Sequence, residues 1–267
     1  HTGYIYDIVN DITHQYAEDS EYPLRKGNLE NGKVIWAVAP AGSNDSEIFM
    51  YDINTSLTIQ ITNNNYNDGP PWMGDNIVVW NSRGLNYSEI QFYDISSGSI
   101  TSMGFQNEID AFPKTENNRI FWSRGTGYNG TAEPWIYDIP TGNLTKIATS
   151  YLYNGIYVHE IDGNWIAWSK YDGNDNEMFI ADVSNTQVGS NINIGSGNVN
   201  VTFTGVTQSG DTTFTQSDNS TPLTTGFKLG GPPTYYQVET TASYTGPVTV
   251  CINYDETQIS GQESHLK

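Results

Sequence analysis

One short phrase recurs five times at a nearly constant interval, and this repeat limits the possible folds more than any other feature of the sequence. The phrase is Tyr-Asp-Ile in four copies and Ala-Asp-Val in the fifth, with its aspartates at Asp7, Asp52, Asp94, Asp138 and Asp182. Consecutive aspartates lie 45, 42, 44 and 44 residues apart. A propeller blade of four strands and their turns needs about 40–45 residues. The interval therefore predicts an all-β fold, a β-propeller of four-stranded blades.

A tryptophan keeps the same interval and closes an apolar run in each repeat. The four copies are Trp36, Trp80, Trp122 and Trp168. Their runs do not alternate with polar residues, which is typical of a strand buried on both faces, as in stacked blades. A tight-turn signal precedes each run, at Asn31-Gly32, Asp75-Asn76, Asn117-Asn118 and Asp162-Gly163. Asn, Asp and Gly tolerate the positive φ of tight hairpins, so these turns fix where the buried strand begins.

The two ends of the repeat region are incomplete. The first repeat starts so late that only its last two strands can be present, and the Leu57-Thr58 type of fourth strand has no counterpart after Asp182. We therefore expect three complete repeats flanked by two incomplete ones, or four to five blades. A ring closed by pairing of its ends and an open arc both fit this count.

The hydrophobic pattern changes after residue 187 to apolar and polar residues in alternation, which is typical of strands. Val199, Val201 and Phe203 alternate with polar residues, as in a half-buried antiparallel strand. Similar alternation returns over residues 236–244 and 248–254, which we predict to be separated by a turn at Gly246-Pro247. The expected organisation is a propeller over residues 1–187 and a β-sandwich over residues 188–267.

Two segments carry family resemblances. The phrase at residues 226–236 (GFKLGGPPTYY), followed by Thr-Thr-Ala at 240–242 and by residues 246–254 (GPVTVCINY), resembles a β-sandwich module of prokaryotic cell-surface proteins. The upstream Trp and Tyr-Asp repeats are similar to TolB-type and other WD40-like propeller repeats, which are common in surface proteins of methanogenic archaea. These resemblances imply a surface protein and do not imply an enzyme.

The resemblance also bears on Cys251 and on the end of the chain. In the sandwich family further strands and a second cysteine follow, so the family pattern implies a disulfide for Cys251 in an oxidising compartment. Two interpretations stay open: the sequence is a fragment, or the sandwich edge is completed by a strand from another copy. Strand addition of that kind would build a filament or lattice.

Composition restricts the partners. The chain has 11 Lys and Arg against 30 Asp and Glu, a formal net charge of −19, which opposes binding to nucleic acid or anionic lipid. No apolar run is long enough to span a bilayer, so we expect no membrane insertion in this segment. The abundance of Tyr, Asn, Ser and Thr favours an extracellular or cell-surface location. Candidate glycosylation sites in Asn-x-Ser/Thr triplets are Asn44, Asn54, Asn86, Asn129, Asn143 and Asn200.

Two acids are candidates for a ligand or catalytic site in the propeller funnel. Asp68 and Asp110 lie near the start of the innermost strands, where a hydrolase would gather its acid and base. Asp next to Gly and Pro caps turns more often than it catalyses, so we favour a turn-capping role. The Tyr-Asp aspartates are interpreted as structural, because a catalytic residue has no reason to recur in every blade. We expect each to accept backbone N–H bonds in the hairpin that follows it.

Metal and cofactor sites are weakly indicated. Asp172, Asn174 and Asn176 space oxygen ligands at alternate positions, but the rest of a calcium loop is missing, so calcium is a weak candidate. The histidines and the single cysteine show no metal-ligand spacing, and no Gly-rich phosphate loop precedes a helix. We expect no cofactor.

The sequence thus favours a non-enzymatic surface protein that acts in architecture or adhesion. Its expected partners are other surface proteins, a second copy of itself, or glycans. The alternatives are a carbohydrate-active enzyme with its site around Asp68 and Asp110, and a glycan-binding module that presents aromatic rings.

Overall fold

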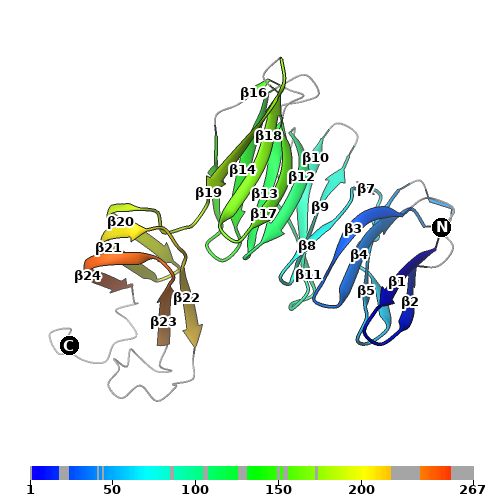
Figure 1. The fold of residues 1–267 in the computed structure, drawn as a ribbon, viewed down its shortest axis with the longest axis horizontal. Coiled ribbons are helices and arrows are strands. Elements are labelled where there is room, and N and C mark those ends of the chain that lie inside the picture. Colours follow the sequence, from blue (N-terminus) through cyan, green and yellow to red (C-terminus); the bar gives the residue numbers. More distant parts are fainter. Residues whose placement is uncertain are drawn as a thin grey trace. The chain divides into compact units, whose positions relative to one another are not determined.

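The computed structural model describes residues 2–17, 24–40, 42–43, 45–84, 87–104, 108–125, 131–148, 151–152, 156–171, 174–217 and 235–253. These residues form strands and turns without a helix, which confirms the predicted all-β fold (Figure 1). No helix that could cross a bilayer occurs in these ranges. The chain divides into two compact units, His1–Asp182 and Val183–Lys267.

The first unit is built from successive antiparallel blades in chain order. The first blade is β1 (Gly3–Asp7) and β2 (Ile12–Ala17), and the second is β3 (Arg25–Glu30), β4 (Lys33–Val38), β5 (Glu47–Asp52) and β6 (Leu57–Gln60). The third blade comprises β7 (Asn67–Asp68), β8 (Trp72–Gly74), β9 (Ile77–Arg83), β10 (Ser88–Asp94) and β11 (Ser99–Ser102). The fourth comprises β12 (Ile109–Glu116), β13 (Arg119–Gly125), β14 (Thr131–Asp138), β15 (Asn143–Lys146) and β16 (Tyr151–Leu152). The fifth is β17 (Tyr157–Asp162), β18 (Trp165–Tyr171) and β19 (Asn176–Asp182).

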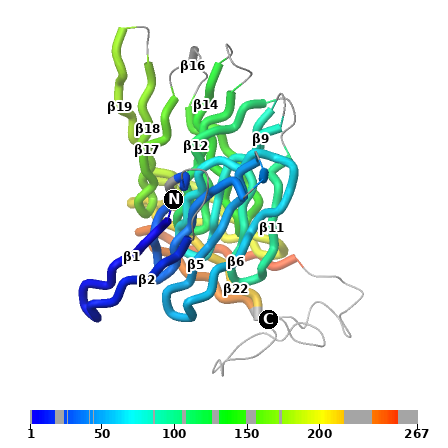
Figure 2. The backbone as a smooth tube through the Cα atoms, turned by 90° about the vertical axis from the view of Figure 1, so that its right-hand side faces the viewer, coloured from blue at the N-terminus to red at the C-terminus, as the bar shows by residue number. Residues whose placement is uncertain are grey.

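The incomplete ends have the predicted composition. The first blade contributes a two-stranded hairpin and the fifth a three-stranded sheet, and Figure 2 shows the hairpin β1–β2 beside the second blade. No pairing joins these two end sheets among the described strands. The third and fourth blades are linked into one ten-stranded sheet by a single parallel pair, Ser88 with Ile109.

Each tryptophan packs backward onto the preceding blade. Trp36 clusters with Ala17 of the first blade, and Trp80 with Ile35 and Met50 of the second. Trp122 lies in a cluster with Val79 and Ile90 of the third blade, and its neighbour Phe121 meets the ring of Trp168 of the fifth blade, with ring centroids 6.3 Å apart. The second strand of each complete blade is therefore buried on both faces, as its unbroken apolar run predicted.

The predicted hairpins lie at the inner end of each blade. Asn31, Asp75 and Asn117 have positive φ angles of 47°, 55° and 51°, and Gly163 has 57°. Asn and Asp reach this left-handed region at low cost, and Gly reaches it freely. These turns bring the innermost strand back to the Trp-bearing strand in every blade from the second to the fifth.

The second unit contains two small sheets that share one apolar cluster. One sheet has the order β20 (Gly189–Ser196), β21 (Val199–Gln208), β24 (Ser243–Ile252), and the other pairs β22 (Thr212–Ser217) with β23 (Tyr235–Thr240). Val201 and Phe203 of β21 are buried, and Phe214 of β22 and Val238 of β23 pack against them. The two-residue alternation predicted for β21 thus turns its apolar side toward the other sheet.

The turn predicted at Gly246-Pro247 is wrong. Both residues lie inside β24, and the chain instead passes from one sheet to the other at Thr241-Ala242. The pairing of β21 with β24 shifts register between Phe203 and Gly205, and Gly246 has a φ of 79°. A Gly with positive φ absorbs the extra residue of a β-bulge, so Gly-Pro here bends a strand instead of ending it.

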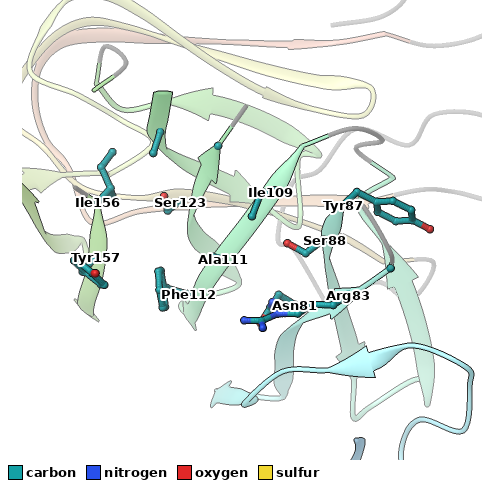
Figure 3. Close-up of a pocket in the computed structure, with 13 residues that line it drawn as sticks. Asn81, Arg83, Tyr87, Ser88, Ile109, Ala111, Phe112, Ser123, Ile156 and Tyr157 are labelled. Atoms are coloured by element: carbon teal, nitrogen blue, oxygen red, sulfur yellow. The ribbon is translucent and has the colours of Figure 1, made fainter. Parts of the chain in front are cut away.

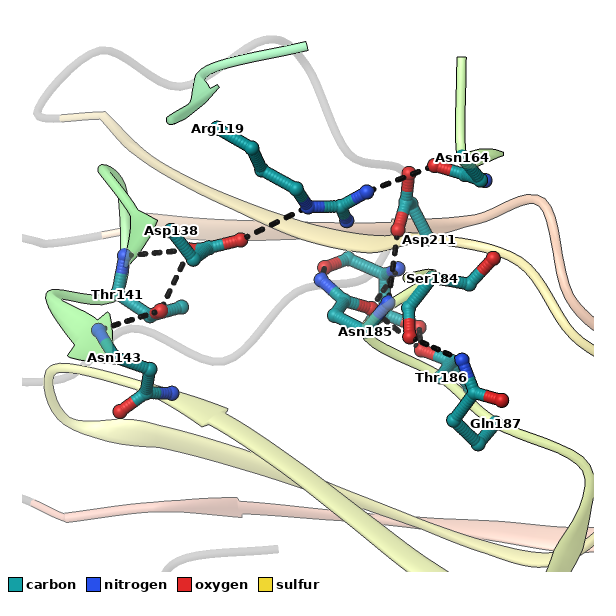
Figure 4. Close-up of polar contacts among 11 residues, drawn as sticks. Arg119, Asp138, Thr141, Asn143, Asn164, Ser184, Asn185, Thr186, Gln187 and Asp211 are labelled. Atoms are coloured by element: carbon teal, nitrogen blue, oxygen red, sulfur yellow. Dashed lines mark hydrogen bonds and ion pairs between the residues drawn. The ribbon is translucent and has the colours of Figure 1, made fainter. Parts of the chain in front are cut away.

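Residues 183–187 belong to the second unit, although the sequence placed the boundary after residue 187. Asn185 donates its backbone N–H to Asp211 Oδ1 at 3.0 Å and its side-chain amide to the Thr212 carbonyl at 2.8 Å (Figure 4). Thr186 exchanges backbone hydrogen bonds with Gly210. These polar contacts anchor the segment that follows Asp182 to the start of β22.

Candidate functional site

The recurring Tyr-Asp aspartates cap the turns that follow them. Asp52 Oδ1 accepts the backbone N–H of Asn54 at 2.8 Å, and Asp94 Oδ1 accepts that of Ser96 at 2.8 Å. Asp7 accepts from Val9 at 2.9 Å. Burial raises the pKa of Asp94, but hydrogen bonds from Ser96 and Ser97 outweigh it and hold that pKa below its usual value. These carboxylates stay ionised and serve local geometry.

Asp138 also ties neighbouring blades together. It accepts the backbone N–H of Thr141 at 3.0 Å and pairs with Arg119, whose Nε lies 3.4 Å from Asp138 Oδ2 (Figure 4). Arg119 Nη1 donates to Asn164 Oδ1 of the fifth blade at 2.8 Å. The contact runs from one blade to the next, so the fourth-blade aspartate contributes to the stacking of blades.

The two funnel candidates are buried acceptors for tryptophan. Asp68 and Asp110 are each 0% exposed. Trp80 Nε1 donates to Asp68 Oδ1 at 3.2 Å, and Trp122 Nε1 donates to Asp110 Oδ1 at 3.0 Å. The carboxylates therefore fix the indoles, which differs from the turn caps that the sequence suggested. The shared spacing of twelve residues between acid and tryptophan was the available signal.

Asp110 is the more perturbed of the two acids. Burial raises its pKa to about 7, against the lowering effect of Arg124, whose Nε lies 3.2 Å from Asp110 Oδ1. Arg124 Nε also pairs with Glu108 at 2.8 Å, and its guanidinium lies over the Trp135 ring, 4.7 Å from the centroid. A carboxyl with a pKa near neutrality is a candidate acid, but this one faces an arginine and an indole inside the blade.

A cavity lies beside these acids without including them. It holds about 230 Å³ and opens between the inner parts of the third, fourth and fifth blades (Figure 3). The lining residues are Asn81, Arg83, Gly84, Tyr87, Ser88, Ile109, Ala111, Phe112, Ser123, Gly125, Ala132, Ile156 and Tyr157. This set contains one cation, three aromatic rings, an amide, two serine hydroxyls and two phenolic hydroxyls, and no carboxylate, imidazole or thiol.

The parallel link between two blades forms part of the cavity wall. Ser88 donates its backbone N–H to the Glu108 carbonyl at 3.1 Å and its hydroxyl to the Asp110 carbonyl at 2.5 Å. Ile109 stands opposite Ser88 in the pairing. Because β12 alternates sides, Ile109 and Ala111 line the cavity while Asp110 points into the blade.

Phe112 stands at an irregular point of the innermost strand. The register of β12 against β13 shifts between Ala111 and Lys114, and Phe112 has a φ of 56°. A positive φ is strained for a bulky residue, and such strain concentrates at functional positions. The Phe112 ring is 49% exposed and lies 5.3 Å from the half-exposed Tyr157 ring, centroid to centroid. Neither residue belongs to a repeating motif, so the repeat pattern of the sequence carries no signal for this pair.

The remaining predicted site residues are dispersed. Asn54 and Asn143 are exposed, Asn200 is half-buried in β21, and Asn44, Asn86 and Asn129 lie outside the described residues. Asn174 and Asn176 are exposed, whereas Asp172 lies outside the described ranges. Within those ranges no three His, Cys, Asp or Glu side chains are grouped to hold a metal ion. Cys251 is exposed on β24.

Comparisons with known proteins support the propeller fold. No family model and no curated protein matches the chain. The β-propeller domain of the Trilobed protease from Pyrococcus furiosus aligns with a TM-score of 0.50 and 13% identity over 75% of this chain and 68% of that one. Puromycin hydrolase also reaches 0.50, with 10% identity over 66% of this chain and 29% of that one.

TolB from Acinetobacter baumannii aligns with a TM-score of 0.43 and 16% identity over 67% of this chain. The aligned region spans about half of the TolB chains, 48% and 53% of their lengths. Identities this low show the fold alone. The alignments that reach a TM-score of 0.50, with the Trilobed protease propeller and puromycin hydrolase, thus support a β-propeller fold for this chain.

Proposed function

We propose that the chain is a non-enzymatic recognition protein of the cell surface or extracellular space, with the propeller as a rigid platform for binding. The observation that supports it is the separation of acids from the cavity. The lining offers aromatic rings, hydroxyls and one guanidinium, while Asp68 and Asp110 are engaged by tryptophan inside the blades. Apolar and aromatic walls with a few polar groups suit binding.

The partners fit surface architecture or adhesion: glycans, other surface proteins, or a second copy of this chain. β24 lies at an edge of its sheet, and its residues Tyr244 and Val250 are about half exposed. Self-association by strand addition at this edge stays a prediction.

A carbohydrate-active enzyme is the second candidate, and the pKa of about 7 for Asp110 is the observation in its favour. The two functions differ in the fate of the ligand, because a recognition protein retains it unchanged and an enzyme converts it to product. We expect the purified chain to be retained by polysaccharides or glycosylated surface material without releasing soluble fragments between pH 4 and 8. Product formation that disappears in Asp110→Asn, with the fold intact by circular dichroism, would establish the enzyme instead.

A further inference from the structure

The cavity between the third, fourth and fifth blades has the chemistry of a specific ligand site. Its volume of about 230 Å³ is below the roughly 300–1,000 Å³ of sites for drug-sized molecules, so it admits one ring-sized group of a larger ligand. In Figure 3 Tyr157 and Ile156 lie at one end of the lining and Tyr87 at the other, with Phe112 and Ala111 between them.

Two of the lining residues, Arg83 and Tyr157, are not explained by the packing of blades. Counting from the tryptophan of each blade, the position of Arg83 is filled by Ala39, Gly125 and Tyr171 in the other blades. The position of Tyr157, eleven residues before its tryptophan, holds Arg25, Gly69 and Ala111 elsewhere. The blades form with quite different residues at these places. The side chains of Arg83 and Tyr157 are therefore available for binding.

Phe112 and Tyr157 supply an apolar ring platform at the cavity. The bulge between Ala111 and Lys114 turns Phe112 out of the regular alternation of β12 and leaves about half of its ring in solvent. A pyranose ring carries C–H groups on one face, and these pack on an aromatic face with loss of apolar surface to water. The Ser123 hydroxyl and the Asn81 amide suit the edges of such a ring, and Ser88 Oγ, whose proton goes to the Asp110 carbonyl, adds an acceptor.

Arg83 supplies the charge. It is exposed, reaches the cavity from the end of β9, and makes no ion pair with the described acids, although the chain carries a net charge of −19. Arg119 and Arg124, by contrast, are both paired with aspartate. A guanidinium in a lining without carboxylates is complementary to an anionic group, and its planar fork matches a carboxylate in two hydrogen bonds.

We propose that this cavity binds a carboxylate-bearing sugar, a uronic acid residue of an acidic glycan. The carboxylate pairs with Arg83, and the sugar ring lies on Phe112 and Tyr157. This inference rests on the proposed recognition function and names its ligand class. An acidic peptide would also satisfy Arg83, but the ring platform and the hydroxyl-rich edges favour the sugar.

The test compares uronic acid oligosaccharides with their carboxyl-reduced neutral forms and with an oligoglutamate peptide, by isothermal titration calorimetry on the full chain. We expect the uronate to bind at least about tenfold more tightly than the neutral form, because the neutral form lacks the charge-assisted hydrogen bonds to Arg83. Arg83→Gln removes that preference and leaves binding of the neutral sugar within about twofold. Arg25→Gln, which removes an equal charge away from the cavity, is the matched control.

Phe112→Gly separates binding from stability. Gly adopts a φ of 56° without strain, so this variant keeps or gains thermal stability while losing the ring, and we expect about tenfold weaker uronate binding. Tyr171→Ala removes an exposed ring outside the lining and leaves binding unchanged.

Each result decides between stated alternatives. Equal binding of uronate and neutral sugar, or a uronate affinity unaffected by Arg83→Gln, overturns the ligand class and leaves the recognition function standing. Tighter binding of oligoglutamate, or no binding of any probe, also overturns the inference. Cleavage of the oligosaccharide during titration overturns the recognition function itself.

Discussion

The equivalent tryptophans of the second to fifth blades are held in two different ways. In the third and fourth blades the indole N–H donates to a buried aspartate, Asp68 or Asp110. In the second and fifth blades Leu24 and Ile156 occupy the aspartate position, and the indole N–H of Trp36 and Trp168 is buried with no hydrogen-bond partner among the described residues.

The cross-strand neighbour compensates in the second and fifth blades. Phe49 stands opposite Trp36 and Phe179 opposite Trp168, and the rings stack at 5.7 Å and 5.6 Å. The third blade has Gln91 at this position, and the fourth has Trp135. The buried indole is thus held either by a hydrogen bond to an aspartate, the polar solution, or by stacking on a phenylalanine, the aromatic solution. The polar solution leaves a buried acid, and the aromatic solution leaves an unsatisfied donor.

The largest expected effect comes from replacing the buried aspartate of the fourth blade by the apolar residue found at the same position of the second blade. Asp110→Leu introduces the kind of residue found at Leu24, but it leaves Arg124 and the Trp122 indole without their buried acceptor. We expect a loss of about 3–5 kcal/mol in the free energy of unfolding, measured by urea titration with tryptophan fluorescence. Asp110→Asn retains an acceptor and is the milder control. Unchanged stability of Asp110→Leu would show that the two solutions are interchangeable.

The next effect is a pH dependence that arises from the buried Asp110 of the fourth blade. The pKa of Asp110 is about 7 in the folded chain against an ordinary 3.8, so the folded state holds the proton more tightly. The unfolded chain ionises first as pH rises from about 4 to 7, so the contribution of Asp110 to stability falls across that window and levels off above it.

Asp110→Asn does not titrate there, so its stability relative to the native chain should rise by a few kcal/mol over the same window, since one pKa unit corresponds to about 1.4 kcal/mol. Urea titrations at pH 4, 5.5, 7 and 8 measure the difference. Parallel curves for the two proteins would contradict the assigned burial of the acid.

The smallest effect distinguishes the indole N–H groups. Trp80→Phe and Trp36→Phe remove similar volume, but only the first takes a donor from a buried carboxylate. We expect Trp80→Phe to cost about 1–2 kcal/mol more than Trp36→Phe. Urea titrations of the two variants at pH 7 measure this difference. Equal losses in the free energy of unfolding would mean that the indole–carboxylate hydrogen bond makes no net contribution to stability.

The sequence predicted the repeating framework well because the framework depends on local and periodic signals. The Trp markers, the Asn-Gly type of turns and the two-stranded start all follow from spacing and turn chemistry. The Gly246-Pro247 error arose because the same dipeptide serves a tight turn or a bulge, and the partner strand decides between them.

The candidate site was less predictable. Asp68 and Asp110 were identified from their place in the chain, but their tryptophan partners lie across a strand pairing whose register was unknown. The cavity brings together Arg83, Phe112 and Tyr157 from three blades. None of the three recurs, so the periodicity that predicts the fold carries no signal for them.

The packing of each tryptophan on the preceding blade makes the joints between blades alike. From the third blade to the fifth, each interface places an indole on the second strand of the preceding blade, so a duplicated or deleted repeat recreates an interface of the same kind. A blade can therefore be added or removed without a new core, while the residues that line the cavity are set independently of the repeat.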